Sequence, residues 1–332
     1  MSKKFKALRV YELENERFER KIEERSINDL LEGEVLIKVK YAALNFKDAL
    51  SATGNKGVTR NYPHTPGIDG VGTVEQCTDG SFNEGDAVIV TSYDLGMNTD
   101  GAFAEYIRVP SKWVVPLPEN LTMKESMVLG TAGVTAGIGM LKLEKLGQTP
   151  EMGPMVVTGA TGGVGSIAVS LLAGAGFEVL ASTGKEEAAD YLKSLGASQV
   201  VDREFTNEDS SKPLIKPKWA GGFDTVGGNT LATLIKGSKY GGTVTSCGLV
   251  SSPVLSTTVF PFILNGINLV GIDSANFPMK ERKIIWENLA GKWKIKNLES
   301  LAKVIKLEEL ESYIQAILKG EVSGRVLVDF DS

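Results

Sequence analysis

A glycine-packed turn over residues 156–165, Val-Val-Thr-Gly-Ala-Thr-Gly-Gly-Val-Gly, constrains the fold more than any other stretch of this sequence. Apolar residues precede the turn and follow it at helical spacing, which indicates a buried strand, a tight reversal and a helix. Gly162 lets backbone approach a pyrophosphate because it has no Cβ, and Gly165 lets the new helix lie close to the sheet. The helix N-terminus offers unpaired N–H groups to the same anion. The pattern predicts a dinucleotide-binding strand–turn–helix, although the usual first glycine is Ala160 here.

The residues that this turn assigns to the cofactor pyrophosphate are Thr161, Gly162, Gly163 and Val164. The end of the following strand, near residue 182, indicates which dinucleotide binds. An NAD site has an Asp or Glu there, about 20 residues beyond the glycines, to bond the ribose 2′-hydroxyl. This chain has no acid at that point but two hydroxyls and a cation, which would hold a 2′-phosphate. The sequence therefore predicts NADPH, held by Ser182, Thr183, Lys185 and, after the next short strand, Arg203, with an ordinary solvated lysine as the alternative for Lys185.

Composition disfavours several classes of protein. The 332 residues allow one large or two ordinary domains, and 36 Lys and Arg against 41 Asp and Glu give a net charge of −5. This charge and the lack of a basic block disfavour binding to nucleic acid or to an anionic membrane. The chain has no run of 18 apolar residues and no apolar segment after its polar start, so neither a span nor a signal peptide is predicted. The two cysteines cannot form a disulfide framework, and we expect a cytoplasmic protein.

The pattern of predicted strands and helices changes twice along the chain. Residues 1–125 read as strands and turns, which is typical of an antiparallel β unit. Residues 126–270 alternate strands with helices, which predicts a doubly wound parallel sheet. After about residue 270 come two predicted helices and a closing strand, and a lone β unit needs covering helices. The sequence therefore predicts an α/β protein with a β-rich domain over 1–125 and 271–332 and a Rossmann nucleotide-binding domain over 126–270.

Further motifs carry a resemblance that spans the chain. They are Ala43–Ala49 (ALNFKDA), Pro66–Gly72 (PGIDGVG), Gly101–Tyr106 (GAFAEY), Gly130–Ala136 (GTAGVTA), Asp190–Ala197 (DYLKSLGA), Tyr240–Gly242 (YGG) and Pro261–Leu264 (PFIL). With the glycine turn, they make the sequence similar to the zinc-free medium-chain dehydrogenases/reductases, in the quinone-oxidoreductase branch that includes the NADPH-dependent acryloyl-CoA reductases. The resemblance implies a GroES-like catalytic domain in addition to the Rossmann domain. The sequence departs from it at Phe46, where a tyrosine is commoner, so no role carries over for that phenolic oxygen.

The same motifs predict a site without zinc. The zinc alcohol dehydrogenases of this superfamily carry a cysteine in the region of Asn45 and a histidine–glutamate pair after Pro-Gly, where this chain has Ile68 and Asp69. A catalytic zinc needs three Cys, His or carboxylate ligands around an open position. The single histidine, His64, precedes this motif, and we expect it to be a surface or loop-bonded imidazole. Without zinc, the reactions expected of bound NADPH are hydride transfer to an activated alkene or to a quinone.

Asn45 and Asp48 are the predicted catalytic residues. Their spacing of three places them on one face if the segment is a helical turn. Asn45 is expected to donate its amide to substrate or cofactor ribose. For Asp48 the options are orienting Asn45, holding a water or supplying a proton. The alternative for Asp48 is an acid that starts a helix or pairs with Lys47.

The resemblance assigns further residues to the cofactor and the substrate. Thr131 packs behind the nicotinamide in related enzymes, with close helix packing as the alternative for so small a side chain. Arg325 is expected to anchor a carboxylate or phosphate of substrate or cofactor, unless it forms an ion pair in the closing strand. The remaining cofactor assignments are Phe46, Leu249 just past a strand end, and Ile263 and Ser274 at the nicotinamide pocket. Lys56 and Arg60 are expected at the phosphates of coenzyme A, with solvated loop residues as the alternative.

The predicted activity is NADPH-dependent transfer of hydride to the β-carbon of an activated alkene, a short enoyl-CoA such as acryloyl-CoA. The first alternative is an NADPH:quinone oxidoreductase that uses the same hydride step. A second alternative, from another class, is a non-catalytic NADPH- or RNA-binding protein, which the negative charge disfavours. The resemblance also implies a homodimer, for which the candidate interface is an edge strand near residues 265–272. The expected partner is therefore a small-molecule substrate, with no nucleic acid and no membrane.

Overall fold

The computed structural model describes residues 3–331, and the chain divides into two compact units. The first unit comprises Met1–Thr131, Ala275–Ala290 and Asn297–Ser332, and the second comprises Ala132–Ser274 and Gly291–Lys296. The first division therefore falls at Thr131, whereas the sequence suggested residue 125. The short segment Gly291–Lys296 groups with the second unit, within a tail that otherwise belongs to the first.

The second unit is built on a six-stranded sheet in which every neighbouring pair is parallel. The strands are β8 (Met155–Val157), β9 (Val179–Ser182), β10 (Gln199–Val201), β11 (Trp219–Asp224), β12 (Ser238–Ser246) and β13 (Asn268–Gly271). Their order across the sheet, β10-β9-β8-β11-β12-β13, is that of a doubly wound dinucleotide-binding fold, so this prediction is confirmed. The order reverses between β8 and β11, which is where such sheets bind their ligands.

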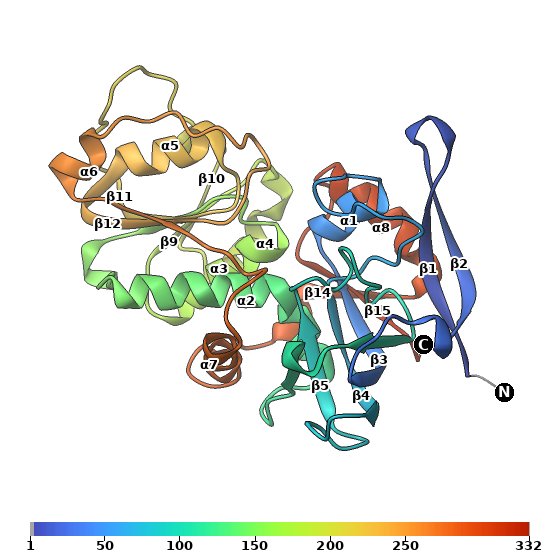
Figure 1. Ribbon diagram of the computed structural model, residues 1–332. Helices are drawn as coiled ribbons and strands as arrows, with labels where there is room; N and C mark the ends of the chain where they lie inside the picture. Colours follow the sequence, from blue (N-terminus) through green and yellow to red (C-terminus); the bar gives the residue numbers. More distant parts are fainter. Residues whose placement is uncertain (1–2, 332) are drawn as a thin grey trace. The chain divides into compact units, whose positions relative to one another are not determined.

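Helices cover both faces of this parallel sheet. They are α3 (Gly163–Gly174), α4 (Ala189–Ser194), α5 (Gly228–Gly237), α6 (Phe260–Asn265) and the second part of α2 (Met123–Lys145). Figure 1 shows α5 and α6 on one face and α2 and α3 on the other. Trp219 is fully buried in the core of this unit, and its indole Nε1 donates a hydrogen bond to the Leu234 carbonyl at 2.9 Å. The indole polar group is thus satisfied where water is excluded.

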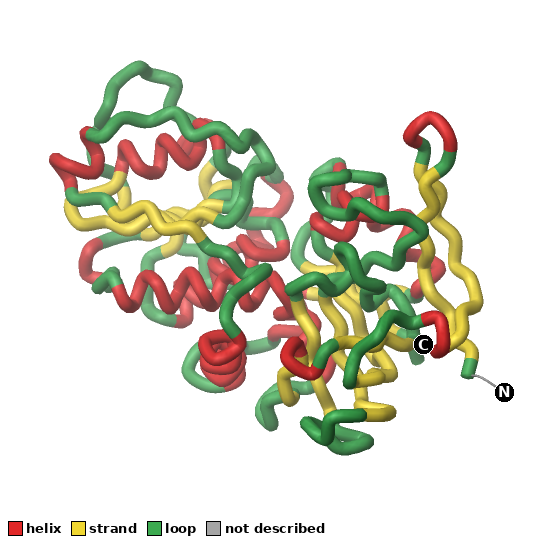
Figure 2. Tube along the Cα trace, viewed as in Figure 1, coloured by secondary structure: helices red, strands yellow, loops and turns green. Residues whose placement is uncertain are grey.

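The first unit holds a mostly antiparallel sheet and a separate hairpin. The sheet strands are β3 (Val35–Leu44), β4 (Asp69–Cys77), β5 (Ala87–Thr91), β6 (Tyr106–Val109), β7 (Val114–Pro116), β14 (Ala302–Ile305) and β15 (Arg325–Asp329). Their order is β14-β15-β3-β4-β5-β7, with β6 paired to β3. Because β15 pairs antiparallel with β3, the C-terminal strand completes this sheet. The hairpin of β1 (Lys4–Glu12) and β2 (Phe18–Ser26) is the long pair of yellow strands near the N-terminus in Figure 2.

Three helices of the first unit accompany this sheet: α1 (Phe46–Ala52), α7 (Met279–Ala290) and α8 (Leu310–Leu318). Helices α1 and α8 pack against each other (Figure 1). They bury Ala49 and Ile314, both 0% exposed, in one apolar cluster with Val326 and Val328 of β15. This packing covers an apolar sheet face, and burial of such side chains is the main stabilising contribution to the unit.

Helix α2 is broken at Gly130, whose φ of 49° and ψ of −150° are not helical. In the part of the chain that the structure describes, α2 is also the one helix long and apolar enough to cross a membrane. Of its most apolar window, 83% is buried inside the protein. This burial is typical of a core helix.

Candidate functional site

The glycine turn joins β8 to α3 as the sequence predicts. Gly162 is the N-cap of α3, and Gly163 begins the helix. A Cβ on Gly165 would lie 2.3 Å from the Gly159 carbonyl oxygen, so only glycine lets the helix start pack on the turn. A Cβ on Gly162 would meet only that same oxygen, at 3.3 Å. Thr161 and Val164 flank these positions. The helix N-terminus therefore presents backbone N–H groups beside a side-chain-free position, which fits a pyrophosphate.

A buried polar group holds the strand ends together at this point. Thr158, just after β8, donates from Oγ1 to Asp224 Oδ1 at 2.7 Å. Thr225 donates in return from Oγ1 to the Thr158 carbonyl at 2.8 Å, and Gly227 N–H donates to Asp224 Oδ2 at 2.8 Å. Burial raises the pKa of Asp224. Sequence reasoning missed this pair, although an acid directly after the buried Phe223 was a signal that a polar group ends this strand.

The end of β9 has the features that a 2′-phosphate requires. A Cβ on Gly184 would lie 2.3 Å from Arg203 Nε, so the guanidinium lies directly against this glycine. Arg203 is exposed and makes no ion pair with any carboxylate in residues 3–331. Thr183 Oγ1 accepts the Lys185 N–H at 3.1 Å, which draws the loop into a tight turn. Arg203, Thr183 and Lys185 thus lie close together where the sequence places them.

The structure corrects the role of Ser182. Its side chain is 3% exposed, and its hydroxyl donates to the Asp202 carbonyl at 3.2 Å. The same hydroxyl bonds Thr206 Oγ1 at 2.9 Å. Ser182 therefore ties β9 to the loop that carries Arg203, and its hydroxyl is turned inward. It supports the loop that the sequence assigns to the 2′-phosphate.

Asp48 starts helix α1 and is completely buried. Its Oδ2 accepts the Asn45 N–H at 2.8 Å, and its Oδ1 accepts the N–H groups of Gly67 at 3.1 Å and Ile68 at 2.8 Å. Burial raises the pKa of Asp48 to about 7, and the nearby charge of Asp69 acts in the same direction. The carboxylate therefore connects α1 to the loop before β4. It is the helix-starting acid that sequence reasoning held as the alternative, and it offers no exposed face to a substrate.

Both polar atoms of the Asn45 side chain are hydrogen-bonded within the protein. Its Nδ2 donates to Asp69 Oδ2 at 2.8 Å and to the Ala43 carbonyl at 3.2 Å, and Asp48 Oδ2 lies 3.3 Å away. Its Oδ1 accepts from Arg325 Nη1 at 3.1 Å. A primary amide has two N–H donors, and both are used here. In this structure Asn45 connects two aspartates and an arginine, and its donation to substrate or ribose stays a prediction.

Asp69 is the centre of this buried cluster. Its Oδ2 accepts the Thr131 N–H at 2.9 Å, and its Oδ1 accepts from Thr131 Oγ1 at 2.5 Å. Burial raises the pKa of Asp69, while the positive charge of Arg325 opposes the shift. A Cβ on Gly130 would lie 2.4 Å from Asp69 Oδ2, so the glycine and its positive φ let α2 bring Thr131 onto the carboxylate. Sequence reasoning used Asp69 only as evidence against zinc and missed this role.

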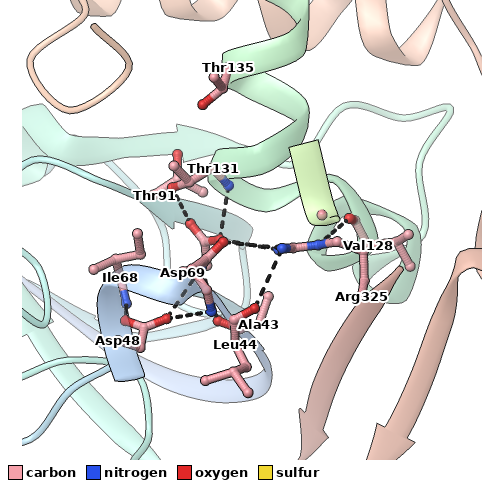
Figure 3. Close-up of polar contacts among 12 residues, drawn as sticks. Ala43, Leu44, Asp48, Ile68, Asp69, Thr91, Val128, Thr131, Thr135 and Arg325 are labelled. Carbon is pink, nitrogen blue, oxygen red and sulfur yellow. Dashed lines mark hydrogen bonds and ion pairs between the residues drawn. The ribbon is translucent and has the colours of Figure 1, made fainter. Parts of the chain in front are cut away.

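Arg325 is buried and forms the ion pair held as its alternative. The residue is 3% exposed, with Nη2 at 3.6 Å from Asp69 Oδ2. Its Nε donates to the Val128 carbonyl at 3.0 Å, as Figure 3 shows. The guanidinium therefore joins β15 to α1, β4 and α2. These groups occupy the guanidinium inside the protein, and its assignment as an anchor for substrate or cofactor stays a prediction.

Sequence reasoning missed two hydroxyl residues, one in each unit. Ser92 Oγ lies 2.8 Å from Thr131 Oγ1, and Ser92 has a φ of 63°. In the second unit, Thr135 donates from Oγ1 to Ser274 Oγ at 2.8 Å. Thr135 lies one helical turn after Thr131, which was the available sequence signal. Ser274, which the resemblance places at the nicotinamide, is thus fixed by α2.

Three apolar residues that the resemblance assigns to the cofactor are exposed at the surface of the protein. Phe46, the first residue of α1, is 40% exposed, Leu249 is 65% exposed and Ile263, in α6, is 68% exposed. Such exposure leaves apolar area available to a ligand or a partner. Lys56, in contrast, forms an ion pair with Glu12 at 2.7 Å and lies over two aromatic rings. A contact between Lys56 and coenzyme A would therefore compete with this ion pair.

The described residues 3–331 contain no group of three His, Cys, Asp or Glu side chains arranged to hold a metal ion. Asp48 and Asp69 lie beside an amide, a hydroxyl and a guanidinium instead. His64 is 3% exposed, and its Nε2 bonds the Gly96 carbonyl at 2.9 Å. Burial lowers the pKa of His64, so the imidazole is neutral at pH 7.

Comparison with known proteins agrees with this architecture. The family "Alcohol dehydrogenase GroES-like domain" matches residues 31–119, and the family "Zinc-binding dehydrogenase" matches residues 163–290. "Putative quinone oxidoreductase YhfP" of Bacillus subtilis (strain 168) is 47% identical over 91% of this chain and 92% of its own. "Acrylyl-CoA reductase AcuI" of Ruegeria pomeroyi is 43% identical over 94% of each chain.

Two solved structures resemble the whole chain. The crystal structure of Bacillus subtilis yhfP with NAD bound has a TM-score of 0.96 and 44% identity, covering 99% of this chain and 100% of its own. The Salmonella enterica yhdH oxidoreductase in complex with NADP has a TM-score of 0.94 and 39% identity, covering 98% of this chain and 99% of its own. The chain therefore belongs to the medium-chain dehydrogenase/reductase family, in its zinc-free quinone-oxidoreductase branch.

Proposed function

We propose that this protein is an NADPH-dependent reductase that acts on the β-carbon of an activated alkene, a short enoyl-CoA such as acryloyl-CoA. The observation that carries the cofactor assignment is the end of β9, where Arg203 lies against Gly184 and no acid is present. The 43% identity to an acrylyl-CoA reductase over 94% of both chains supports the substrate class. Membership of an oxidoreductase family makes the protein an enzyme.

Bound NADPH supplies a hydride to the substrate. The protein's own contribution is to hold the two reactants and to stabilise the oxygen that gains negative charge. Thr161, Gly162, Gly163 and Val164 form the turn proposed for the pyrophosphate, and Thr183, Lys185 and Arg203 form the place proposed for the 2′-phosphate. Phe46, Thr131, Leu249, Ile263 and Ser274 remain proposed contacts of the cofactor.

A quinone oxidoreductase is the second candidate function. The 47% identity to "Putative quinone oxidoreductase YhfP" favours it, because this relative matches over 91% of the chain. The exposed apolar side chains Leu249 and Ile263 also suit a flat, apolar acceptor. A quinone needs hydride but no contacts to the phosphates of coenzyme A.

Steady-state NADPH oxidation distinguishes these candidates. The assay uses acryloyl-CoA, a simple quinone and no acceptor, each with NADPH and with NADH. We expect turnover of acryloyl-CoA with NADPH and little with NADH. Turnover of the quinone alone would replace the proposed function by the alternative, and NADPH binding without turnover of either acceptor would support a non-catalytic binding protein.

Arg203→Ala tests the cofactor site. A charge-assisted hydrogen bond contributes about 1.5–3 kcal/mol, so loss of the guanidinium should weaken NADPH binding about 10- to 100-fold. NADH binding should change little because NADH has no 2′-phosphate. Fluorescence titration measures both, with Lys216→Ala, an exposed lysine of the same unit, as the control. Equal loss for the two cofactors would place the 2′-phosphate elsewhere.

We also infer a homodimer in the cytoplasm. Strand β13 has a neighbour on one side only, so its other edge is open to a second copy. Leu269 on this strand is 37% exposed, and α6 beside it exposes further apolar side chains. The buried α2 and the two free cysteines accord with a cytoplasmic protein that binds neither membrane nor nucleic acid.

A further inference from the structure

Ser92 follows β5 in a backbone conformation that non-glycine residues seldom adopt. Its φ is 63°, and that of Tyr93 is 53°. Strained pairs of this kind cluster at functional sites, where the surrounding structure imposes them. Here Ser92 N–H donates to the Ile68 carbonyl at 2.8 Å, and Tyr93 N–H donates to the Ala275 carbonyl at 3.0 Å. The fold thus holds the Ser92 side chain, 3% exposed, at an unfavourable backbone position.

The strained backbone places the Ser92 hydroxyl at the end of a directed chain. Thr131 has a single hydroxyl proton, and it is donated to Asp69 Oδ1 at 2.5 Å. When Asp69 is a carboxylate, Ser92 is therefore the donor in its 2.8 Å bond to Thr131. When Asp69 is a carboxylic acid, both bonds reverse: Asp69 donates to Thr131, Thr131 donates to Ser92, and the Ser92 proton is available to a ligand. The chain runs from Ser92 through Thr131 to Asp69, so two short transfers can move a proton between Ser92 and a buried carboxyl group.

The proposed reaction needs a proton donor, and three positions that could have carried one do not supply it. Hydride addition to an enoyl thioester leaves an enolate, whose α-carbon must gain a proton. Asp48 is enclosed by backbone donors, and neutral His64 is bonded to a carbonyl. Position 46 is a phenylalanine, which has no proton to give. Thr131, by contrast, is the residue proposed to contact the nicotinamide, and Ser92 is its direct hydrogen-bond partner.

We propose that Ser92 delivers the α-proton and draws it from Asp69 through Thr131, an inference that rests on the proposed enoyl reductase function. The enolate's electron pair forms the new C–H bond as the Ser92 O–H bond breaks. The Thr131 proton moves to Ser92, and the proton of the Asp69 carboxylic acid moves to Thr131. Asp69 is left as a carboxylate 3.6 Å from the Arg325 guanidinium. Because Asp69 is completely buried, its proton returns from solvent through Ser92 and Thr131 between turnovers. Burial, which raises the pKa of Asp69, supports its holding that proton.

The first test needs no cofactor. The protein is incubated with propanoyl-CoA in D₂O without NADPH, and exchange of the α-hydrogens is followed by mass spectrometry. In the carboxylate form of Asp69 the chain is oriented to accept an α-proton, so the wild type should catalyse exchange. Ser92→Gly should slow exchange at least about tenfold, because glycine tolerates the φ of 63° but has no hydroxyl.

A matched control is Ser51→Ala. Ser51 and Thr59 form another buried hydroxyl pair of the first unit, 2.7 Å apart, outside the proposed chain. This variant should exchange the α-hydrogens at the wild-type rate. Thr131→Val, which removes the middle hydroxyl of the chain, should slow exchange as Ser92→Gly does. Exchange by Ser92→Gly at the wild-type rate would overturn the proposal.

Turnover gives the second readout. General acid catalysis contributes roughly 10²–10⁴-fold, so kcat of Ser92→Gly with acryloyl-CoA should fall by about 100-fold or more. The Kd for NADPH should stay within about twofold of the wild type. If the wild type reduces acryloyl-CoA and Ser92→Gly retains more than half of the wild-type kcat, the relay is overturned and the proposed function stands. Failure of the wild type to reduce acryloyl-CoA would overturn both.

Discussion

Asn45 shows how a side chain can be central to a site without facing a ligand. Its amide joins two aspartates to an arginine, and both of its N–H donors are used. Three charged groups share this cluster: Asp48, Asp69 and Arg325. Buried ionic groups are tolerated only when they are paired and hydrogen-bonded, so each member depends on the others. The neutral amide is the connection that lets two carboxylates lie close together in a water-free interior.

This cluster makes stability depend on pH. The pKa of Asp48 is about 7 in the folded protein, against an ordinary value of 3.8. The folded state therefore binds more protons than the unfolded state between these values, and the free energy of unfolding should fall as pH rises from about 4 to about 7. The raised pKa of Asp69 also makes the free energy of unfolding fall as pH rises. The lowered pKa of His64 has the opposite effect on the free energy of unfolding.

Asp48→Asn measures this contribution, because the amide cannot ionise. Urea unfolding at several pH values between 4 and 8 should show a smaller fall in stability for the variant than for the wild type. The exposed Asp209→Asn serves as the control and should follow the wild-type curve. Parallel curves for the wild type and Asp48→Asn would show that Asp48 ionises in the folded protein as it does in the unfolded chain.

At the scale of elements, the break in α2 decides where a hydroxyl and a backbone N–H point. A continuous helix would have used the Thr131 N–H in its own ladder, since each N–H bonds the carbonyl four residues earlier. The non-helical Gly130 frees that N–H to reach Asp69 Oδ2. Glycine is required here for two reasons: the backbone has a positive φ, and a Cβ would collide with the Asp69 carboxylate.

Gly130→Ala should therefore destabilise the protein strongly. At φ 49° and ψ −150° the backbone lies in a region that is almost limited to glycine, where strain costs another residue about 1–3 kcal/mol, and displacement of Asp69 adds to that cost. We expect a loss of at least about 2 kcal/mol in urea unfolding. Gly174→Ala, at the end of α3 with open space around its Cβ position, should be neutral or stabilising by up to about 1 kcal/mol. Equal effects at the two sites would contradict the role assigned to Gly130.

At the scale of the whole molecule, the open edge of β13 is the feature that invites a second copy. An unpaired strand at the edge of a sheet presents free N–H and C=O groups along its length. Here the edge lies beside exposed apolar side chains of α6, including Phe260 and Ile263. Pairing of two such edges would extend the parallel sheet of one copy into that of another, and would cover the apolar surface.

Leu269→Lys tests this dimer. The substitution places a charge on the exposed face of β13, which should oppose pairing of two edges. Analytical ultracentrifugation should show a dimer for the wild type and a weakened dimer or a monomer for the variant. Leu31→Lys, at a comparably exposed leucine of the first unit, should remain dimeric. A wild type that sediments as a monomer at micromolar concentration would refute the inferred homodimer.

Much of the fold follows from local sequence patterns. The alternation of strands and helices, the glycine turn and the closing strand at Arg325–Val328 each depend on residues close together in the chain, and each is present in the structure. The site was less predictable. Asn45, Asp48 and Arg325 were named, and the local bond between Asn45 and Asp48 fits their spacing of three. Their other partners, including Ile68, Asp69 and Val128, come from distant segments that no local pattern reveals.

The sequence by itself determined the two kinds of unit, the family and the acid-free end of β9, since glycine spacing, apolar periodicity and residue identity are local properties. Only the tertiary structure decided which polar side chains remain available to a ligand. Asp69 became the centre of the cluster because β4, α1, α2 and β15 converge on it, and Ser92 gained a donor's orientation from Thr131. Hydrogen-bond capacity is limited, so partners from distant segments determine which groups are already used.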